Sequence, residues 1–297
     1  FWEGHFRNAG FTHGMTTSGR HGGDGLTIGR ETLQPIADFL DHTAKGRAFF
    51  LWYAPMLPHK PHTPPERFQA RYRDRKLPVR ARDYYATISW FDETVGRLLE
   101  LLSARGLLDR TLVAFVVDNG WVPRRDESRR SAVGSKNTPF EAGVRTPVIL
   151  FWPGRIRPAI HDDLVSTVDI MPTLLEAAGV AVPEGQPGVS LLPVAKGEKR
   201  KLERDAVFGE IYWHTARAVR PPSVNLLFRW IRQGTWKLIV PESPSRGGPR
   251  LYDLAQDRSE TRNLADRPEL RERLQSMRRR LDAWWRPADA TVTAPVH

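Results

Sequence analysis

The chain has 297 residues, and its 45 Lys and Arg against 34 Asp and Glu give a formal net charge of +11. It contains no cysteine, which excludes disulfide bonds and thiolate-bound metals. No apolar run reaches the roughly eighteen residues that a membrane-spanning helix needs. The basic residues are scattered among acidic ones without an aromatic-interleaved motif, so neither nucleic acid nor a membrane is an expected partner.

The predicted elements alternate between helix and strand over the first two thirds of the chain. In chain order they are a Gly- and His-rich loop over residues 1–30, a helix opening at 32–35, a strand at 48–54, a helix through 84–102, strands at 112–117 and 148–152, a helix at 169–178 and a Pro/Gly-rich connector at 183–197. Continuous apolar runs are typical of strands buried on both faces, and the helix between the first two strands fits a parallel crossover.

From about residue 206 the pattern changes to shorter, alternating segments. Strands are predicted at 207–213, 227–232 and 235–240, with a hairpin turn at Gln233-Gly234, and an amphipathic helix at about 268–285. We therefore expect an α/β domain over residues 1–205 and a small second subdomain over residues 206–297, made of an antiparallel sheet and a helix.

Three polar clusters come directly after apolar strands. They are Pro58-His59 with His62, Asp118-Asn119-Gly120, and the run from Gly134 to Pro147 that contains Lys136. Ligands of open α/β folds bind outside the carboxyl ends of the strands, where such clusters meet. Hard oxygen donors with a lysine and a histidine suit a divalent cation that holds an oxyanion ester. Taken alone, however, Asp118-Asn119-Gly120 is also typical of an ordinary Asx turn.

These clusters resemble the motifs of the sulfatase family. The matching pieces, in the family's order between about residues 48 and 285, are Pro58-His59, Asp118-Asn119-Gly120, Gly134–Pro147, Val168–Leu175, Leu251–Leu254 and Glu260–Leu264. The resemblance implies an alkaline-phosphatase-like fold, with a mostly parallel sheet sandwiched by helices. It also implies a hydrolase that acts on an anionic sulfate ester.

The resemblance assigns the cation and anion sites to the second and third clusters. Asp118 and Asn119 would bind the metal, Ca²⁺ rather than Mg²⁺, and Lys136 would bind a sulfate oxygen. A compact ammonium with three donors suits a tetrahedral anion. The family has Glu-Gly-Gly where this chain has Glu141-Ala142-Gly143, and we expect the added Cβ to leave the lysine in place.

The remaining roles fall on the first cluster and on the turn after Lys136. His59, held between prolines, would contact the ester and protonate its leaving oxygen. His62 is either a neighbour of the substrate pocket or a structural residue. Glu141 and Arg145 are expected to brace their loop through an ion pair.

One part of the family pattern is not found in these residues. Sulfatases carry C-x-P-S-R or S-x-P-S-R, whose first residue becomes the formylglycine nucleophile, and an early Asp-Asp pair on the metal. We expect both to lie on a segment upstream of Phe1, and the 297 residues alone to be inactive. Ser243-Pro244-Ser245-Arg246 mimics the end of the first motif and Asp162-Asp163 mimics the second; we interpret them as a turn and a solvated pair.

Three functions agree with these motifs. The first is a sulfuric-ester hydrolase, and the second is a phosphonate monoester or phosphodiester hydrolase with the same metal and nucleophile chemistry. The third is a catalytically silent protein that only binds the anion. Sulfated polysaccharides, aryl sulfates and choline sulfate all remain candidate substrates. The family suggests a periplasmic or secreted protein, while the sequence leaves the compartment and the oligomeric state open.

Overall fold

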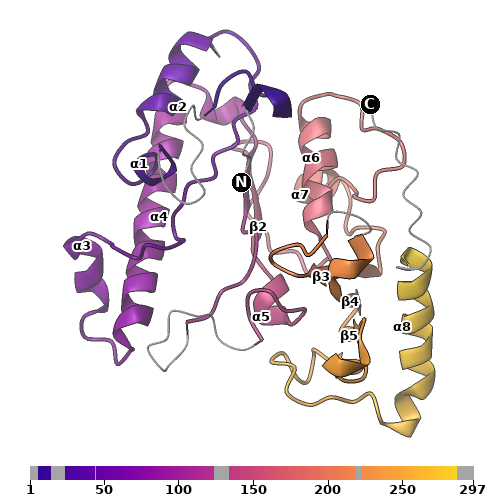
Figure 1. Cartoon of the computed structure of the whole chain (residues 1–297). Coiled ribbons are helices and arrows are strands. Elements are labelled where there is room, and N and C mark those ends of the chain that lie inside the picture. Colours follow the sequence, from indigo (N-terminus) through magenta and orange to yellow (C-terminus); the bar gives the residue numbers. More distant parts are fainter. Residues whose placement is uncertain (1–5, 15–23, 44, 124–133, 219–221, 286–297) are drawn as a thin grey trace. The chain divides into compact units, whose positions relative to one another are not determined.

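A computed structural model describes residues 6–14, 24–43, 45–123, 134–218 and 222–285 (Figure 1). The chain divides into two compact units. The first comprises residues 1–111 with 123–130, and the second comprises residues 112–122 with 131–297.

The first unit is helical in the residues that the structure describes. Its elements are η1 (Phe6–Ala9), α1 (Asp24–Thr27), α2 (Gln34–Asp38), the π-helical turn η2 (Phe39–Thr43), α3 (Glu66–Gln69), η3 (Ala70–Tyr72), α4 (Val79–Ala104) and η4 (Leu108–Arg110). The loop predicted over residues 1–30 thus contains two short helices, and its residues 1–5 and 15–23 lie outside the described part. The helices predicted at 32–35 and 84–102 are confirmed as α2 and α4.

Two apolar clusters hold this unit together along α4, its longest helix (Figure 1). One joins α2 to the C-terminal part of α4 through Leu33, Ile36, Leu40 and Leu102. The other joins α3 to the middle of α4 through Phe68, Ala86 and Trp90, and it also buries Leu57. Leu57 is two residues before His59, so the second cluster anchors the loop that carries this histidine.

The segment 48–54 differs from the prediction of a doubly buried strand. It is extended, but it joins no β-ladder among the described residues. Phe49, Leu51 and Tyr53 pack on the cluster of α2 and α4, whereas Phe50 and Trp52 are 61% and 70% exposed. The side chains therefore alternate between two faces, as they do in any extended chain, and an apolar run does not by itself supply a neighbouring strand.

The second unit begins with a two-stranded sheet. Strands β1 (Val113–Val116) and β2 (Val148–Phe151) pair antiparallel, with Val113 opposite Phe151 and Val116 opposite Val148. The strands predicted at 112–117 and 148–152 are thus confirmed. The parallel pairing expected between 48–54 and 112–117 is not among the ladders of the described residues, where β1 pairs antiparallel with β2.

Helix α5 (Glu141–Val144) lies between the two strands in the chain, and further short helices follow β2. These are η5 (Thr167–Asp169), α6 (Ile170–Ala177) and α7 (Leu192–Ala195), of which α7 lies in the predicted connector 183–197. At the start of α6, Asp169 is completely buried and accepts two hydrogen bonds from the Arg204 guanidinium, at 2.6 and 2.7 Å. The Val168–Leu175 motif therefore has a structural role, because its acid ties α6 to the segment before the second sheet.

A four-stranded antiparallel sheet and a helix complete this unit. The elements are β3 (Ala206–Tyr212), η6 (Pro222–Asn225), β4 (Leu226–Gln233), β5 (Trp236–Pro241), η7 (Pro244–Arg246), β6 (Arg250–Asp253), η8 (Pro268–Leu270) and α8 (Arg271–Trp284), with the strands in the order β3-β4-β5-β6. The three predicted strands, their hairpin and the helix are confirmed. Strand β6 was not predicted, because its sequence Arg-Leu-Tyr-Asp is neither a continuous apolar run, as in β1 and β2, nor a longer alternation, as in β3 to β5.

The two faces of this sheet have different coverings. Helix α8 lies along one face (Figure 1), where Met277 and Leu281 pack with Ile231, Leu238 and Leu251. On the other face, Ile239 and Tyr252 pack with Phe140, the residue before α5. Alternate residues of β5 therefore pack against α8 on one face of the sheet and against Phe140 on the other.

These elements confirm an α/β protein with a small antiparallel sheet and a C-terminal helix. No helix of the described residues is long and apolar enough to cross a membrane. The second sheet begins at Ala206, where the sequence pattern changes, and the domain boundary between residues 205 and 206 stays a prediction.

Candidate active site

Strand β1 ends in a tight turn that exposes two oxygen-bearing side chains. Asp118 is exposed and Asn119 is half-buried. The Asp118 carboxylate accepts a hydrogen bond from the Asn119 amide nitrogen at 2.8 Å, as in an Asx turn. Only this local bond engages the Asp118 carboxylate within the described residues, so its remaining lone pairs are open to a ligand.

A second turn presents Lys136. Its neighbour Ser135 is buried and accepts a hydrogen bond from the Thr138 hydroxyl to its backbone carbonyl at 2.5 Å. Asn137 has a φ of +65°, a left-handed conformation that asparagine adopts more readily than most residues. Lys136 itself is half-buried, and no carboxylate of the described chain pairs with its ammonium. An unneutralised cation on a fixed turn is suited to binding an anion.

Helix α5 joins these two turns through close backbone contacts. The Gly120 amide donates to the Gly143 carbonyl at 2.9 Å. A Cβ on Gly120 would lie 2.1 Å from the Ala142 carbonyl oxygen, and one on Gly143 would lie 2.4 Å from the Ser135 carbonyl oxygen. Both positions thus require glycine for steric reasons. Ala142 is exposed, so the departure from the Glu-Gly-Gly pattern falls where a methyl group has room, as predicted.

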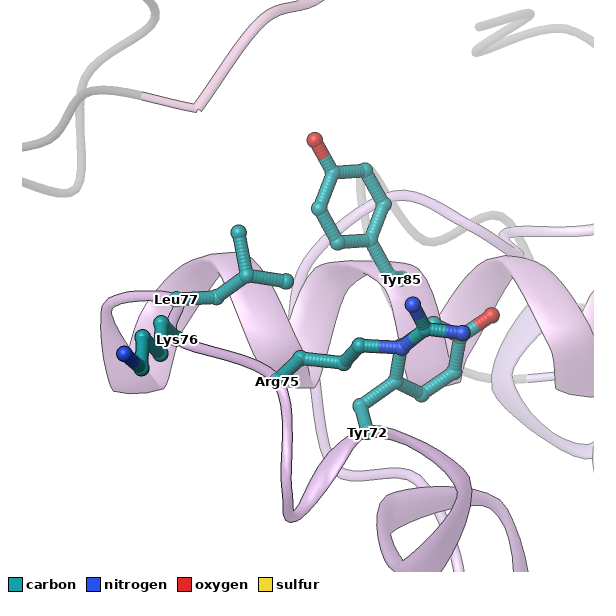
Figure 2. Close-up of a pocket in the computed structure, with 5 residues that line it drawn as sticks. All are labelled: Tyr72, Arg75, Lys76, Leu77 and Tyr85. Carbon is teal, nitrogen blue, oxygen red and sulfur yellow. The ribbon is translucent and has the colours of Figure 1, made fainter.

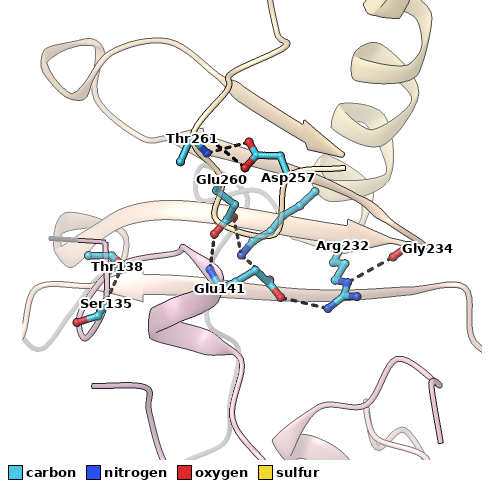
Figure 3. A network of polar contacts seen from close by, with 9 residues as sticks. Ser135, Thr138, Glu141, Arg232, Gly234, Asp257, Glu260 and Thr261 are labelled. Carbon is cyan, nitrogen blue, oxygen red and sulfur yellow. Dashed lines mark hydrogen bonds and ion pairs between the residues drawn. The ribbon is translucent and has the colours of Figure 1, made fainter. Parts of the chain in front are cut away.

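A buried ion network holds α5 on the C-terminal sheet (Figure 3). Glu141, the first residue of α5, lies 2.8 Å from the Lys237 ammonium and 3.2 Å from the Arg232 guanidinium. Lys237 is 0% exposed and also lies 3.1 Å from Glu260. The predicted bracing role of Glu141 is therefore supported, but the cations that pair with it are Lys237 and Arg232, whereas Arg145 is exposed.

Glu260 completes this network in an unusual conformation. One carboxylate oxygen accepts a hydrogen bond from the Glu141 backbone amide, while the other makes only its charge contact with Lys237. Burial raises the pKa of Glu260, and the nearby Lys237 charge opposes that rise. The residue has a φ of +54°, which is rare for a residue other than glycine. Such a conformation persists only where the surrounding contacts hold it.

His59 lies in the first unit, on an exposed loop. Its ring Nδ1 is 3.1 Å from the Lys60 carbonyl, and its amide donates to the Met56 carbonyl at 2.6 Å. The Arg30 guanidinium donates to the carbonyls of Pro61, at 3.0 Å, and of His59, at 3.4 Å. Arg30 also stacks over Trp90, with 5.3 Å between its Cζ atom and the ring centroid, so it fastens the loop to α4.

His62 packs against α4 on the same loop. Its ring centroid lies 5.3 Å from that of Tyr84. Burial, followed by the charge of Lys60, lowers the pKa of His62. The neutral imidazole is therefore favoured at neutral pH, which suits a packing residue or a hydrogen-bonding neighbour of a ligand.

The donor set for a cation is partial. Asp118 and Asn119 can supply two of the roughly six to eight oxygens that Ca²⁺ prefers. A group of three or more His, Asp or Glu side chains that could hold a metal does not occur within residues 6–14, 24–43, 45–123, 134–218 and 222–285. The two residues fit a divalent cation in chemistry, as part of a larger ligand set.

Other candidate features lie apart from these residues. A shallow hollow of about 460 Å³ is lined by Tyr72, Arg75, Lys76, Leu77 and Tyr85 (Figure 2). It contains none of the predicted site residues. The Ser243–Arg246 segment forms the 3₁₀ turn η7, as predicted. Asp162 is exposed, whereas Asp163 accepts a hydrogen bond from the Leu202 amide at 2.9 Å and so has a structural role.

Family models match both parts of the chain. The model described as "Sulfatase" matches residues 15–180, and the model described as "N-sulphoglucosamine sulphohydrolase, C-terminal" matches residues 135–286. The first spans the Asp118-Asn119-Gly120 turn, His59 and Lys136, and the second spans α5 and the four-stranded sheet. The chain belongs to the sulfatase family.

Individual relatives agree with this assignment. Arylsulfatase A of Bos taurus is 31% identical over 247 residues, which are 76% of this chain and 46% of that protein. A solved structure from a study of glycosaminoglycan metabolism in Bacteroides thetaiotaomicron has a TM-score of 0.69 at 20% identity, covering 87% of this chain and 59% of the other. Phosphonate monoester hydrolase SpPMH from Silicibacter pomeroyi has a TM-score of 0.57 at 25% identity, covering 74% of this chain and 44% of the other. The chain spans between 44% and 59% of the length of these three relatives.

Three residues that support the site were not found from sequence. Lys237 lies in an alternating strand, Arg30 in a Gly-rich loop, and Glu260 belongs to a motif whose role its letters do not reveal. Each contacts a site loop that is distant along the chain, as shown by the 96 residues between Glu141 and Lys237. No local pattern could have found Lys237 or Arg30, whereas the Glu260–Leu264 match was a signal without an assigned function.

Proposed function

We propose that the protein hydrolyses organic sulfate esters. Lys136 binds a sulfate oxygen, and its ammonium stabilises the charge that develops as the ester bond breaks. His59 protonates the leaving oxygen, and His62 is a neutral neighbour of the bound substrate. The observation that carries the proposal is a half-buried lysine that pairs with no carboxylate of the described residues. Its turn and the Asp118-Asn119 turn both pack against helix α5, in a chain of the sulfatase family.

Asp118 and Asn119 would contribute two oxygens to a divalent cation, Ca²⁺ in preference to Mg²⁺. When bound, such a cation withdraws charge from the ester oxygens. The sulfatase family also uses a formylglycine nucleophile, and these 297 residues contain no C-x-P-S-R or S-x-P-S-R motif from which it could be made. The proposal therefore concerns the full-length gene product.

A phosphonate monoester hydrolase is the second candidate, supported by the likeness to SpPMH. Both activities use an oxyanion-binding lysine and a metal, so the residue types at positions 59, 118, 119 and 136 do not separate them. The relative rates of hydrolysis of a matched sulfate ester and phosphonate ester do separate the two activities.

The test compares 4-nitrophenyl sulfate with 4-nitrophenyl phenylphosphonate, using the purified full-length gene product before and after removal of metals. We expect a higher kcat/KM for the sulfate, loss of activity with a chelator, and better recovery with Ca²⁺ than with Mg²⁺. A higher value for the phosphonate would favour the second candidate. Sulfate binding without turnover of either ester would indicate the catalytically silent protein.

A further inference from the structure

The C-terminal sheet is linked to the turn of Lys136 by a short chain of contacts. Lys237 on β5 contacts Glu141 on α5, and α5 packs against the backbone of Ser135 and Thr138 on either side of Lys136. These steps involve a buried charge pair and backbone atoms in close contact. A displacement of β5 would therefore be transmitted to the lysine.

Successive side chains of β5 point to opposite faces of the sheet. The contact of Lys237 with α5 therefore lies on the other face from the apolar core under α8. Leu238 faces α8 and packs with Met277 and Leu281, whereas Lys237 faces α5 and the Trp230 ring. In the ladder of β4 and β5, Lys237 is opposite Arg232, so both cations reach Glu141 from one face. A fully buried lysine and a partly exposed arginine on adjacent strands would repel each other without this carboxylate.

A lysine that only stabilised the sheet would be easy to replace, because a buried ion pair is seldom more stable than an apolar side chain of the same size. This network instead contains Glu260 with a positive φ. That conformation costs stability, and strained backbone is concentrated at functional sites. The network is therefore better explained by what it holds in place than by the stability it adds.

We propose that Lys237 and Glu260 are positioning residues for the sulfate-binding lysine: through Glu141 they fix α5, and α5 fixes the turn of Lys136 and that of Asp118. The proposal rests on the sulfate-binding role of Lys136 set out above. It gives the C-terminal subdomain a part in catalysis, although neither Lys237 nor Glu260 touches the substrate.

The test is a double-mutant cycle in the full-length gene product. A single Lys237→Met change would leave the buried Glu260 carboxylate without a cation and Glu141 with Arg232 alone, and could unfold the protein. The main variant therefore combines Lys237→Met with Glu141→Gln and Glu260→Gln, which removes all three charges at similar volume. We combine it with Lys136→Ala, and use Leu238→Ala, on the opposite face of β5, as the matched control.

The triple variant should stay folded and lose roughly a hundredfold in kcat, the scale of a displacement of about 1 Å in a site. In the Lys136→Ala background it should cost much less kcat, because the lysine through which most of its effect passes is gone and only the turn of Asp118 remains to be displaced. Leu238→Ala should lower the melting temperature and leave kcat of the folded enzyme unchanged. An equal loss of kcat with and without Lys136 would overturn the proposal.

Amide hydrogen exchange over residues 134–144 tests the brace without any substrate. We expect faster exchange there in the triple variant than in Leu238→Ala. Unchanged exchange in the triple variant would overturn the proposal, even if the parent protein hydrolyses sulfate esters. If the parent instead hydrolyses no sulfate ester, the proposed function fails, and the exchange result alone decides whether Lys237 and Glu260 hold the turn.

Discussion

The loops of His59 and Lys136 are fixed in different ways. The His59 loop lies on the surface of a helical unit, where Arg30 binds its carbonyls and Leu57 anchors one end. The Lys136 turn instead rests on α5, and that helix is held by a network of the fully buried Lys237, the buried Glu260 and the largely buried Glu141. The His59 loop is thus held mainly by hydrogen bonds from one side chain, whereas the Lys136 turn is held by the helix on which it packs.

This difference predicts different responses to mutation. The His59 loop can become mobile while the helices behind it stay folded, because each hydrogen bond from Arg30 to its carbonyls contributes separately. A buried charge network responds as a unit, because the loss of one member leaves its partners unpaired in a medium of low dielectric constant. Four predictions test the comparison, from the largest expected effect to the smallest.

Replacing His59 by Ala should have the largest effect on an alkyl sulfate, whose leaving oxygen needs a proton. We expect kcat to fall by about 10²–10⁴, the usual contribution of general acid–base catalysis, and to fall much less for 4-nitrophenyl sulfate. Steady-state kinetics of the full-length gene product measure both, with the exposed His161→Ala as control. An equal loss on the two esters would contradict proton donation by His59.

Replacing Lys136 by Ala should lower kcat by about 10²–10³, the effect of losing one preorganised electrostatic contact. KM should rise less, because the ammonium stabilises the transition state more than the bound ester. Lys136→Arg should recover little, since a planar guanidinium does not replace a compact ammonium. The control is the exposed Lys201→Ala. A kcat of Lys136→Ala within twofold of the parent would show that this lysine is not part of the active site.

Replacing Arg30 by Ala should loosen the His59 loop at a moderate cost. Loss of its hydrogen bonds and of its contact with Trp90 is expected to lower the free energy of unfolding by about 1–2 kcal/mol. Urea unfolding of the 297-residue chain measures the change. Arg73→Ala, which breaks an exposed pair with Glu66, should cost at most about 0.5 kcal/mol. Equal losses would mean that Arg30 is an ordinary surface residue.

Acidification should weaken the His59 loop through His62, which gives the smallest effect. The pKa of His62 is lower in the folded chain than its unfolded value of about 6.5. Its contribution to stability is therefore present above that value and is lost as the pH falls through the folded pKa. Melting temperatures at pH 7.5 and 5.0 should differ more for the parent than for His62→Phe, which keeps the ring beside Tyr84. The exposed His161→Phe should behave like the parent, and identical pH dependence in all three would contradict this role.

Local patterns in the sequence predicted most of the elements of the fold. Helices α4 and α8 and the hairpin of β4 and β5 have a period that the backbone itself imposes. Pairing was harder to predict, because a ladder depends on a second segment whose distance along the chain the pattern does not contain. The apolar run 48–54 therefore predicted an extended segment correctly but gave no information on its neighbours.

The candidate site shows the same limit. The roles proposed for Asp118, Asn119, Lys136 and His59 come from motifs that are contiguous in the chain. Lys237 was not, since a lysine within an alternating strand is usually exposed, and its burial depends on a carboxylate 96 residues away. Residues that present a ligand-binding group can thus be predicted from short sequence motifs. The residues that hold those motifs in place can be identified only from the tertiary structure.

The contact between Gly120 and Gly143 sets limits on how this protein can evolve. At either position even the single methyl group of alanine would have to force two stretches of backbone apart. Ala142, whose side chain is exposed, carries no such constraint. A laboratory selection for new substrates should therefore leave the two glycines unchanged and accept varied residues at position 142. Conversely, the methyl group that Gly143→Ala adds would push α5 away from the turn of Lys136. The change would uncouple that turn from the turn of Asp118 without adding a charge to either.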